Sequence, residues 1–132
     1  MLYPPEPAPP LLIAEDNHDN RTLFVDYFSA KGYRVIAAPH GQEAVELAAS
    51  SRPAIIVMDI QMPGLDGLEA IRQIRAIPAL RATPIIALTA LAMSGDRERC
   101  LDAGANAYLT KPASMRALRE LIESLLRGES QA

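Results

Sequence analysis

The sequence predicts a doubly wound α/β fold, in which a five-stranded parallel sheet carries helices on both faces. Short segments that are apolar at nearly every position alternate along the chain with segments of helical periodicity. Strands that are apolar throughout are typical of parallel sheets, because both faces of such a sheet are buried. Strict alternation of strands and helices then requires right-handed crossovers, which place helices on both sides of the sheet. The 132 residues suit a single domain of this kind.

The five predicted strands are short and share the same apolar character. They cover Leu11–Ala14, Arg34–Ala37, Ala54–Met58, Pro84–Leu88 and Ala107–Leu109. Doubly wound sheets bind their ligands beyond the carboxyl ends of the strands, at the point where the strand order reverses. The residues that directly follow the strands are therefore the candidates for a functional site.

The first predicted helix has an apolar stripe of Leu23, Phe24, Tyr27 and Phe28 and ends before Gly32, a residue type favoured just after a helix. This spacing places the four side chains on one face of the helix.

Four further helices are predicted, and three of them have an apolar face. The apolar positions are Ala44, Val45 and Ala48 in the helix Gln42–Ala49, Leu68, Ile71 and Ile74 in the third helix, and Leu118, Leu121, Ile122 and Leu125 in the last. The fourth helix, Asp96–Ala103, is stopped by Gly104. The last helix follows Ser114, whose hydroxyl can cap it, and ends before Gly128.

The two ends of the chain differ from the rest in composition. Five of the eleven prolines fall within residues 1–10, which favours an extended arm. The folded domain is expected over residues 11–126, with a short tail at 127–132.

Charge and composition exclude several classes of function. The formal net charge of −3 argues against nucleic acid as a direct partner, because binding to a polyanion requires clustered basic residues. A membrane partner is not expected, because no apolar run approaches the roughly 18 residues that span a bilayer. The single cysteine, Cys100, cannot form an intrachain disulfide, and the first residues lack the features of a secretory signal. A cytoplasmic protein is expected.

Acidic residues follow two of the predicted strands. Glu15 and Asp16 come after the first strand and Asp59 after the third. If the strand order is 2-1-3-4-5, these two strands are neighbours and the three carboxylates converge. Such crowding is relieved either by raised pKa values or by a divalent cation, and carboxylate oxygens suit Mg²⁺. Metal binding is the better of the two interpretations.

The remaining strand ends supply groups that complement a phosphoryl site. Lys111 follows the fifth strand as a point cation, and Thr89 follows the fourth as a hydroxyl donor. A carboxylate can attack phosphorus to form an aspartyl-phosphate, with catalysis mostly by positioning and neutralisation of charge. Asp59 is the candidate acceptor, because it is the single acid at the end of a central strand.

Four separated motifs together resemble the receiver domain of two-component response regulators. They are Glu15–Asp16, Met58–Gly64, Leu88–Ala90 and Tyr108–Pro112. The resemblance covers about Leu11 to Leu126 and implies the 2-1-3-4-5 strand order. It also implies that Asp59 takes a phosphoryl group from a phosphohistidine on a histidine kinase or a histidine phosphotransfer protein.

The resemblance implies roles for the other residues of the site. Glu15 and Asp16 form the acidic pair, and Mg²⁺ is held by Asp16, Asp59 and the backbone carbonyl of Gln61. Lys111 holds a phosphoryl oxygen.

A switch is implied as well. Thr89 moves to the phosphoryl group and Tyr108 swings inward behind it. The Lys111–Pro112 peptide is expected to be cis. The surface that signals to a downstream protein partner is expected on the fourth helix, fifth strand and fifth helix, with Arg97, Leu101, Tyr108, Arg116 and Arg119 among its residues.

Details of the motifs indicate a subgroup. Ala113 follows the Lys-Pro pair, where DNA-binding regulators often carry an aromatic residue, and the domain expected over residues 11–126 is expected to leave no space for an output module in these 132 residues. The motifs look more like those of single-domain regulators and hybrid histidine kinase receivers, and both readings stay open.

Three other functions fit less well. A flavodoxin-like cofactor binder needs a phosphate loop rich in Ser, Thr and Gly, where this chain has Glu15 and Asp16. An aspartyl-phosphate hydrolase needs a second acid two residues after the nucleophile, where this chain has Gln61. A binding module that works without phosphorylation would not need the complete set of acids, threonine and lysine. A phosphorylation-dependent switch is expected, rather than an enzyme that turns over a substrate.

Overall fold

A computed structural model describes residues 10–62, 64–90, 95–111 and 114–128 of the chain. Its five strands are β1 (Pro10–Ala14), β2 (Arg34–Ala38), β3 (Ile55–Asp59), β4 (Ile85–Thr89) and β5 (Ala107–Thr110). They form one sheet in the order β2-β1-β3-β4-β5, with every pair parallel. The predicted five-stranded parallel sheet and its order are confirmed.

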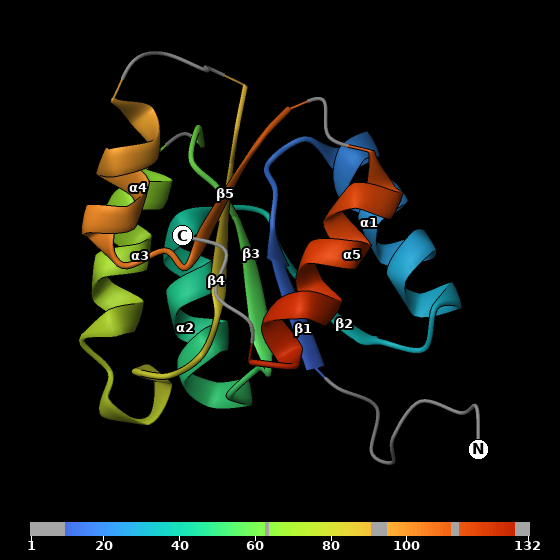
Figure 1. Cartoon of the computed structure of the whole chain (residues 1–132), viewed down its shortest axis with the longest axis horizontal. Coiled ribbons are helices and arrows are strands. Elements are labelled where there is room, and N and C mark those ends of the chain that lie inside the picture. The colour runs from blue at the N-terminus through green and yellow to red at the C-terminus, as the bar shows by residue number, and fades with distance from the viewer. Residues whose placement is uncertain (1–9, 63, 91–94, 112–113, 129–132) are drawn as a thin grey trace.

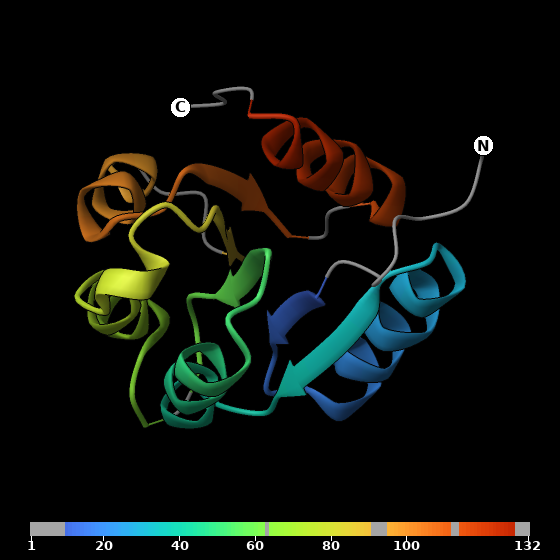
Figure 2. The same cartoon turned by 90° about the horizontal axis from the view of Figure 1, so that it is seen from below.

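Helices separate the strands along the chain. They are α1 (His18–Ala30), α2 (Gly41–Ser51), α3 (Gly67–Arg75), α4 (Asp96–Ala103) and α5 (Met115–Leu126), with a short 3-10 helix, η1 (Pro78–Leu80), after α3. Helices α1 and α5 cover one face of the sheet and α2, α3 and α4 cover the other (Figure 1 and Figure 2). The doubly wound arrangement is therefore confirmed.

The sheet separates two hydrophobic cores. Leu11 and Ile13 of β1 face the core under α1 and α5, which includes Phe28. Leu12 and Ala14, the alternate residues of the same strand, face the core under α2, α3 and α4. Because both faces are covered, successive strand residues are all buried, which explains the unbroken apolar runs in the sequence.

Strand boundaries differ from the prediction by one residue. Strand β1 begins at Pro10, since the first position of a strand tolerates a residue without an N–H, and the Pro10 carbonyl accepts a hydrogen bond from Ala54 at 2.8 Å. Asp59 and Thr89 are the last residues of β3 and β4 rather than the first loop residues. The sheet itself therefore fixes the backbone of both side chains.

The predicted stripe of α1 is only partly buried. Phe24 and Phe28 lie in the core, whereas the side chain of Leu23 is 58% exposed. Leu23 precedes Phe24 by one residue, about 100° around the helix, which turns it away from the sheet. The prediction that Leu23 lies on the buried face of the helix is wrong.

Three predictions fall outside the described part of the chain. They are the proline-rich arm apart from Pro10, the cis peptide at Lys111–Pro112, and the tail beyond Gly128. Among the described residues, no helix has the length and apolar character needed to cross a bilayer.

Candidate functional site

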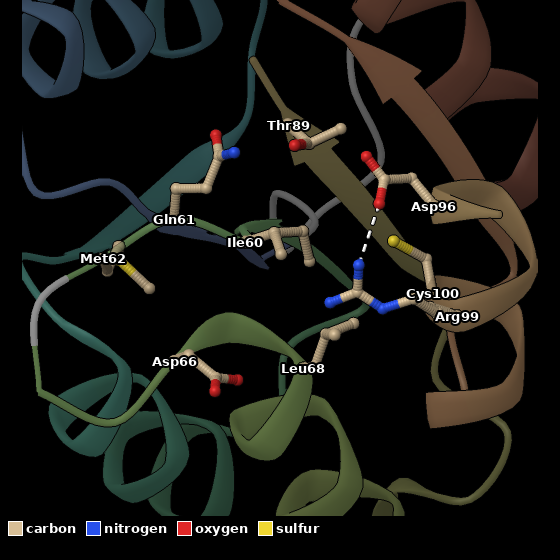
Figure 3. Close-up of a pocket in the computed structure, with 9 residues that line it drawn as sticks. All are labelled: Ile60, Gln61, Met62, Asp66, Leu68, Thr89, Asp96, Arg99 and Cys100. Atoms are coloured by element: carbon tan, nitrogen blue, oxygen red, sulfur yellow. Dashed lines mark hydrogen bonds and ion pairs between the residues drawn. The ribbon is translucent and has the colours of Figure 1, made fainter. Parts of the chain in front are cut away.

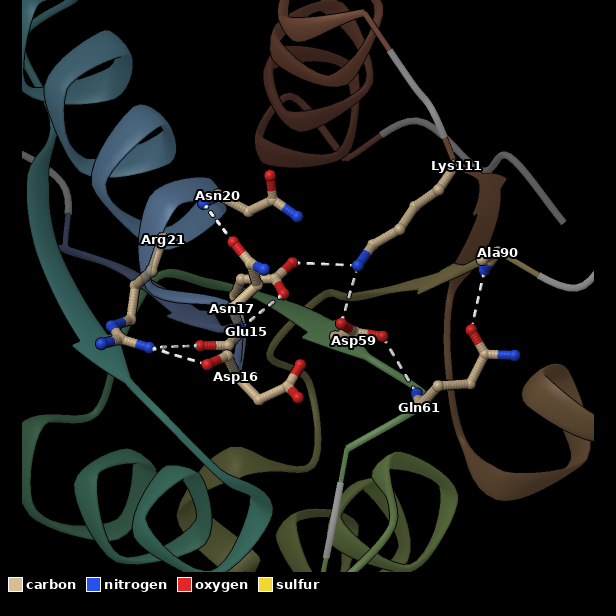
Figure 4. A network of polar contacts seen from close by, with 9 residues as sticks. All are labelled: Glu15, Asp16, Asn17, Asn20, Arg21, Asp59, Gln61, Ala90 and Lys111. Carbon is tan, nitrogen blue, oxygen red and sulfur yellow. Dashed lines mark hydrogen bonds and ion pairs between the residues drawn. The ribbon is translucent and has the colours of Figure 1, made fainter.

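Three carboxylates meet where β1 and β3 end side by side. Ala14 of β1 pairs with Met58 of β3, so Glu15 and Asp59, the residues that follow them, lie side by side at the carboxyl ends of the two strands. Glu15, Asp16 and Asp59 each offer an oxygen, and these three atoms lie within 4.8 Å of one another. Glu15 and Asp59 are almost fully buried, at 1% and 2% exposure, and Asp16 is exposed. The convergence predicted from the strand ends is present in the structure (Figure 4).

Lys111 reaches this cluster from the end of β5. Its Nζ donates to Asp59 Oδ2 at 2.7 Å and to Glu15 Oε1 at 3.0 Å. Burial alone would lower the pKa of Lys111, but the hydrogen bonds to Asp59 and Glu15 outweigh burial and raise this pKa above 10.5. The lysine is thus held as a cation against two buried acids.

The pKa of Glu15 shows the effect of burial and of the neighbouring acid. Burial raises the pKa of its carboxyl above 4.5, and the nearby charge of Asp59 raises it further. Hydrogen bonds from Lys111 and from the Asn17 N–H oppose the shift without cancelling it. One lysine therefore does not fully offset the burial and mutual repulsion of these carboxylates, and a further cation would stabilise their ionised forms.

Asp59 is also bonded on its other oxygen. The Gln61 N–H donates to Asp59 Oδ1 at 2.9 Å, and Gln61 Oε1 accepts a hydrogen bond from the Ala90 N–H at 2.9 Å. Gln61 therefore links the loop after β3 to the residue after β4, as Figure 4 shows.

Helix α3 begins directly against the backbone of Asp59. A Cβ placed on Gly67 would lie 2.6 Å from Ile60 Cα and would also clash with the Asp59 carbonyl oxygen. Asp66 caps the helix by accepting a hydrogen bond from the Glu69 N–H at 2.9 Å. Only glycine allows this helix start to approach the strand end so closely.

Thr89 and Tyr108, the predicted switch pair, lie on neighbouring strands. Thr89 is 3% exposed at the end of β4, and its register partner on β5 is Thr110. Tyr108 is half-buried two residues earlier on β5 and packs against the core under α2, α3 and α4. Thr89 lines a cavity of about 290 Å³ between the β3–α3 loop and α4, into which Cys100 also faces (Figure 3).

The residues expected on a signalling surface are accessible to different degrees. Arg97 and Arg116 are exposed, whereas Leu101, Tyr108 and Arg119 are half-buried.

Two features of the site were missed from the sequence. Exposed Leu23 lines a hollow of about 540 Å³ with Phe24 and Met115, beside Lys111 and Glu15. Arg21 Nη1 donates to the backbone carbonyls of Glu15 at 2.9 Å and Asp16 at 3.3 Å. No motif marks either feature, although an arginine one turn into the helix after an acidic pair is within reach of that loop.

The residues present fit Mg²⁺. The three clustered side chains offer only oxygen atoms, the donor type this ion prefers, and the backbone carbonyl of Gln61 follows two residues after Asp59. Burial, and to a smaller extent the charge of Asp59, raises the pKa of Glu15, so a cation bound at the cluster would favour its ionised form.

Comparisons with known proteins agree with this geometry. Residues 11–123 match the family model of the response regulator receiver domain. The chain is 44% identical over 116 residues to the polar-differentiation response regulator DivK of Brucella anthropi, covering 88% of this chain and 94% of that protein.

Solved structures give the same result. The receiver domain of a sensor histidine kinase from Pseudomonas aeruginosa PAO1, with a magnesium ion coordinated in its active-site cleft, is 42% identical with a TM-score of 0.84, covering 91% of this chain and 98% of that one. The chemotaxis protein CheY4 of Vibrio cholerae is 26% identical with a TM-score of 0.84, covering 88% and 97%.

Proposed function

We propose, from the premise that the chain belongs to the response regulator receiver domain family of two-component signalling, that Asp59 accepts a phosphoryl group from a phosphohistidine. The observation that carries this proposal is the position of Lys111, whose Nζ lies 2.7 Å from Asp59 Oδ2 within a buried acidic cluster. The donor is a histidine kinase or a histidine phosphotransfer protein, the partner class of receiver domains.

The reaction is a transfer of one phosphoryl group. A carboxylate oxygen of Asp59 forms a bond to phosphorus while the bond from phosphorus to the donor imidazole nitrogen breaks. The electron pair of that bond goes to the imidazole nitrogen, and Asp59 becomes an acyl phosphate. Attack of water on phosphorus later returns the Asp59 carboxylate and inorganic phosphate.

The residues of the cluster divide this work. Glu15, Asp16, Asp59 and the Gln61 carbonyl would hold Mg²⁺, which when bound neutralises phosphoryl charge and orients the transferring group. Lys111 moves its hydrogen bond from Asp59 to a phosphoryl oxygen, which replaces one anionic partner by another. Catalysis of this kind is positioning and neutralisation of charge, so the protein acts as a switch and not as an enzyme with a turnover substrate.

The hollow beside Lys111 supports access by a donor. Leu23, Phe24 and Met115 form an apolar rim directly next to Lys111 and Glu15. A donor protein that covers this rim would bring its imidazole to the mouth of the site and exclude water from it.

The output of the switch is a changed affinity for a downstream protein. Thr89 at the end of β4 would turn its hydroxyl to the phosphoryl group, and Tyr108 would follow inward. Thr89 lies in β4, which pairs with the strand of Asp59, and Tyr108 lies in β5, the next strand of the sheet. This path supports a readout on the surface that carries Arg97 and Arg116.

Phosphorylation of the purified protein tests the proposal. With Mg²⁺ and a small phosphodonor such as acetyl phosphate, we expect one phosphoryl group per chain in the wild type, labile as an acyl phosphate is, and none in Asp59→Asn. Asp26→Asn, which replaces an exposed acid on α1, is the matched control and should be phosphorylated like the wild type. Labelling that persists in Asp59→Asn would move the acceptor to another residue, and absence of labelling in the wild type would contradict the proposal.

A further inference from the structure

Asp16 is positioned in a different way from the other two acids. Glu15 is bonded to Lys111 and Asn17, and Asp59 to Lys111 and Gln61. Within the described residues, the Asp16 carboxylate has no hydrogen bond or ion pair. The position of this carboxylate therefore depends on its backbone.

The backbone at this point has left the sheet. The last sheet-type hydrogen bond of this segment runs from the Glu15 N–H to the Ala38 carbonyl at 3.0 Å. The carbonyls of Glu15 and Asp16 then both accept from Arg21 Nη1, at 2.9 Å and 3.3 Å. Arg21 holds the peptide units on either side of the Asp16 Cα.

Arg21 is itself firmly placed. It lies in the first turn of α1, where its N–H donates to the Asn17 carbonyl at 2.9 Å. Asn17 caps the same helix by accepting a hydrogen bond from the Asn20 N–H, and Arg21 Nη2 lies 3.4 Å from His18 Nδ1. In Figure 4 the guanidinium is on one side of the loop, and the Asp16 carboxylate is on the side that faces Asp59.

We propose that Arg21 is a positioning residue for the metal site, which fixes the Glu15–Asp16 backbone so that the Asp16 carboxylate faces Asp59. This inference rests on the proposed Mg²⁺ site and adds to it a residue outside the ligand set. Groups that orient metal ligands typically change metal affinity by about 10- to 100-fold when they are removed.

The direction in which Mg²⁺ affinity changes when Arg21 is removed distinguishes a positioning role from a purely electrostatic one. Arg21 is a cation near the site of a second cation, so by Coulomb repulsion alone its removal would strengthen Mg²⁺ binding. Loss of a positioning residue would instead weaken binding, because the free loop must be ordered when the ion binds.

Titration calorimetry with MgCl₂, without any phosphodonor, measures this sign. We expect Arg21→Ala to weaken Mg²⁺ binding by roughly tenfold, the lower end of the range for orienting groups. Arg21→Lys keeps the charge and one donor group, so it should restore part of the affinity. Arg34→Ala removes the same charge from the opposite end of the sheet, at the start of β2, and should bind Mg²⁺ like the wild type.

A second measurement checks that the role is positioning. In phosphorylation by acetyl phosphate, Arg21→Ala should require more Mg²⁺ for half-maximal rate while the rate at saturating Mg²⁺ stays close to that of the wild type. Thermal unfolding in EDTA verifies that the variants are folded, and Arg21→Lys provides the comparison if Arg21→Ala is not.

The outcomes separate this role from the proposed function. Unchanged or tighter Mg²⁺ binding by Arg21→Ala overturns the role of Arg21 alone. A wild-type protein that binds no Mg²⁺ overturns the metal site together with this role. Phosphorylation of Asp59→Asn would overturn the acceptor assignment and leave the Mg²⁺ titrations of Arg21 as they are.

Discussion

Helices α3 and α4 flank the same cavity but are held in different ways. Helix α3 has a side-chain cap from Asp66, starts against the Asp59 backbone at Gly67, and buries five of its residues. Helix α4 starts after Gly95, which has a left-handed φ of 88° and gives no side-chain cap, and buries only Cys100 and Ala103.

Helix α4 is instead held at its far end. Arg75, the last residue of α3, donates from Nε to the Gly104 carbonyl at 2.9 Å and from Nη1 to the Leu80 carbonyl at 2.9 Å. Its Nη2 also donates to Asn106 Oδ1. Helix α3 begins at the backbone of Asp59, and α4, whose N-cap Gly95 gives no side-chain cap, lies beside Thr89 at the cavity. In the proposed function, we therefore expect a change at Asp59 to displace α4 at lower cost than α3, because α4 buries fewer residues.

The largest expected effect on stability comes from a substitution at the start of α3, where the helix contacts the Asp59 backbone. Gly67→Ala would force its Cβ against the Asp59 carbonyl and Ile60 Cα, both backbone atoms that cannot rotate away. We expect a loss of about 3 kcal/mol in the free energy of unfolding, measured by urea denaturation. Gly95→Ala is the matched control, because no atom of the described residues lies within 4 Å of the position its new Cβ would take, and the strain of the left-handed φ costs about 1 kcal/mol. Equal losses in the two variants would contradict the contrast between the helices.

A smaller effect is expected at the far end of α4. Arg75→Ala removes the side-chain donor of the Gly104 carbonyl and leaves the Leu80 carbonyl with the Thr83 N–H, which should cost about 2 kcal/mol in the same unfolding measurement. Arg81→Ala removes an exposed arginine just beyond η1 and should stay within about 0.5 kcal/mol of the wild type. If Arg75→Ala is as stable as Arg81→Ala, the helix is not held at this end.

The smallest expected effect is on the pH dependence of stability, and it comes from the buried acid Glu15 beside Asp59. Because burial raises the pKa of Glu15 in the folded protein, its contribution to stability is complete below pH 4.5 and is lost as the pH rises through the raised pKa. Glu15→Gln carries no charge to bury, so without divalent cations it should gain stability relative to the wild type over that window. The two proteins should be equally stable at lower pH.

Urea unfolding in EDTA at a series of pH values measures this difference. Glu98→Gln replaces an exposed acid on α4 and should follow the wild type throughout. If the difference in unfolding free energy between Glu15→Gln and the wild type does not change with pH, ionisation of Glu15 does not destabilise the folded protein.

The sequence predicted most of the fold because the information is local. Helix α4 was predicted with its observed bounds, Asp96–Ala103, and Ser114 was predicted as the cap that it is, accepting from the Ala117 N–H. Strand ends were less certain, since Asp59 and Thr89 are polar residues inside the sheet and interrupt the apolar pattern that marks a strand.

The site could be predicted only where the chain order constrains it. Parallel strands bring Glu15, Asp59 and Lys111 to one edge, so their convergence follows from the topology. The contacts of Arg21 and Arg75 do not follow, because an arginine can reach many acceptors and only the packed helices select among them. The exposure of Leu23 was missed for a related reason, since the rotation of a helix against its sheet is set by tertiary packing.

The scarcity of lysine gives the site a chemical reporter. Lys31 and Lys111 are the two lysines of the chain, and their environments are opposite. Lys31 is exposed near the Tyr27 ring, whereas Lys111 holds its proton against two carboxylates. Amine-directed reagents attack the unprotonated amine, so Lys111 is protected from labelling as long as those carboxylates face it. Peptide mass mapping of one modified lysine against the other thus reads the state of the pocket in the unaltered protein.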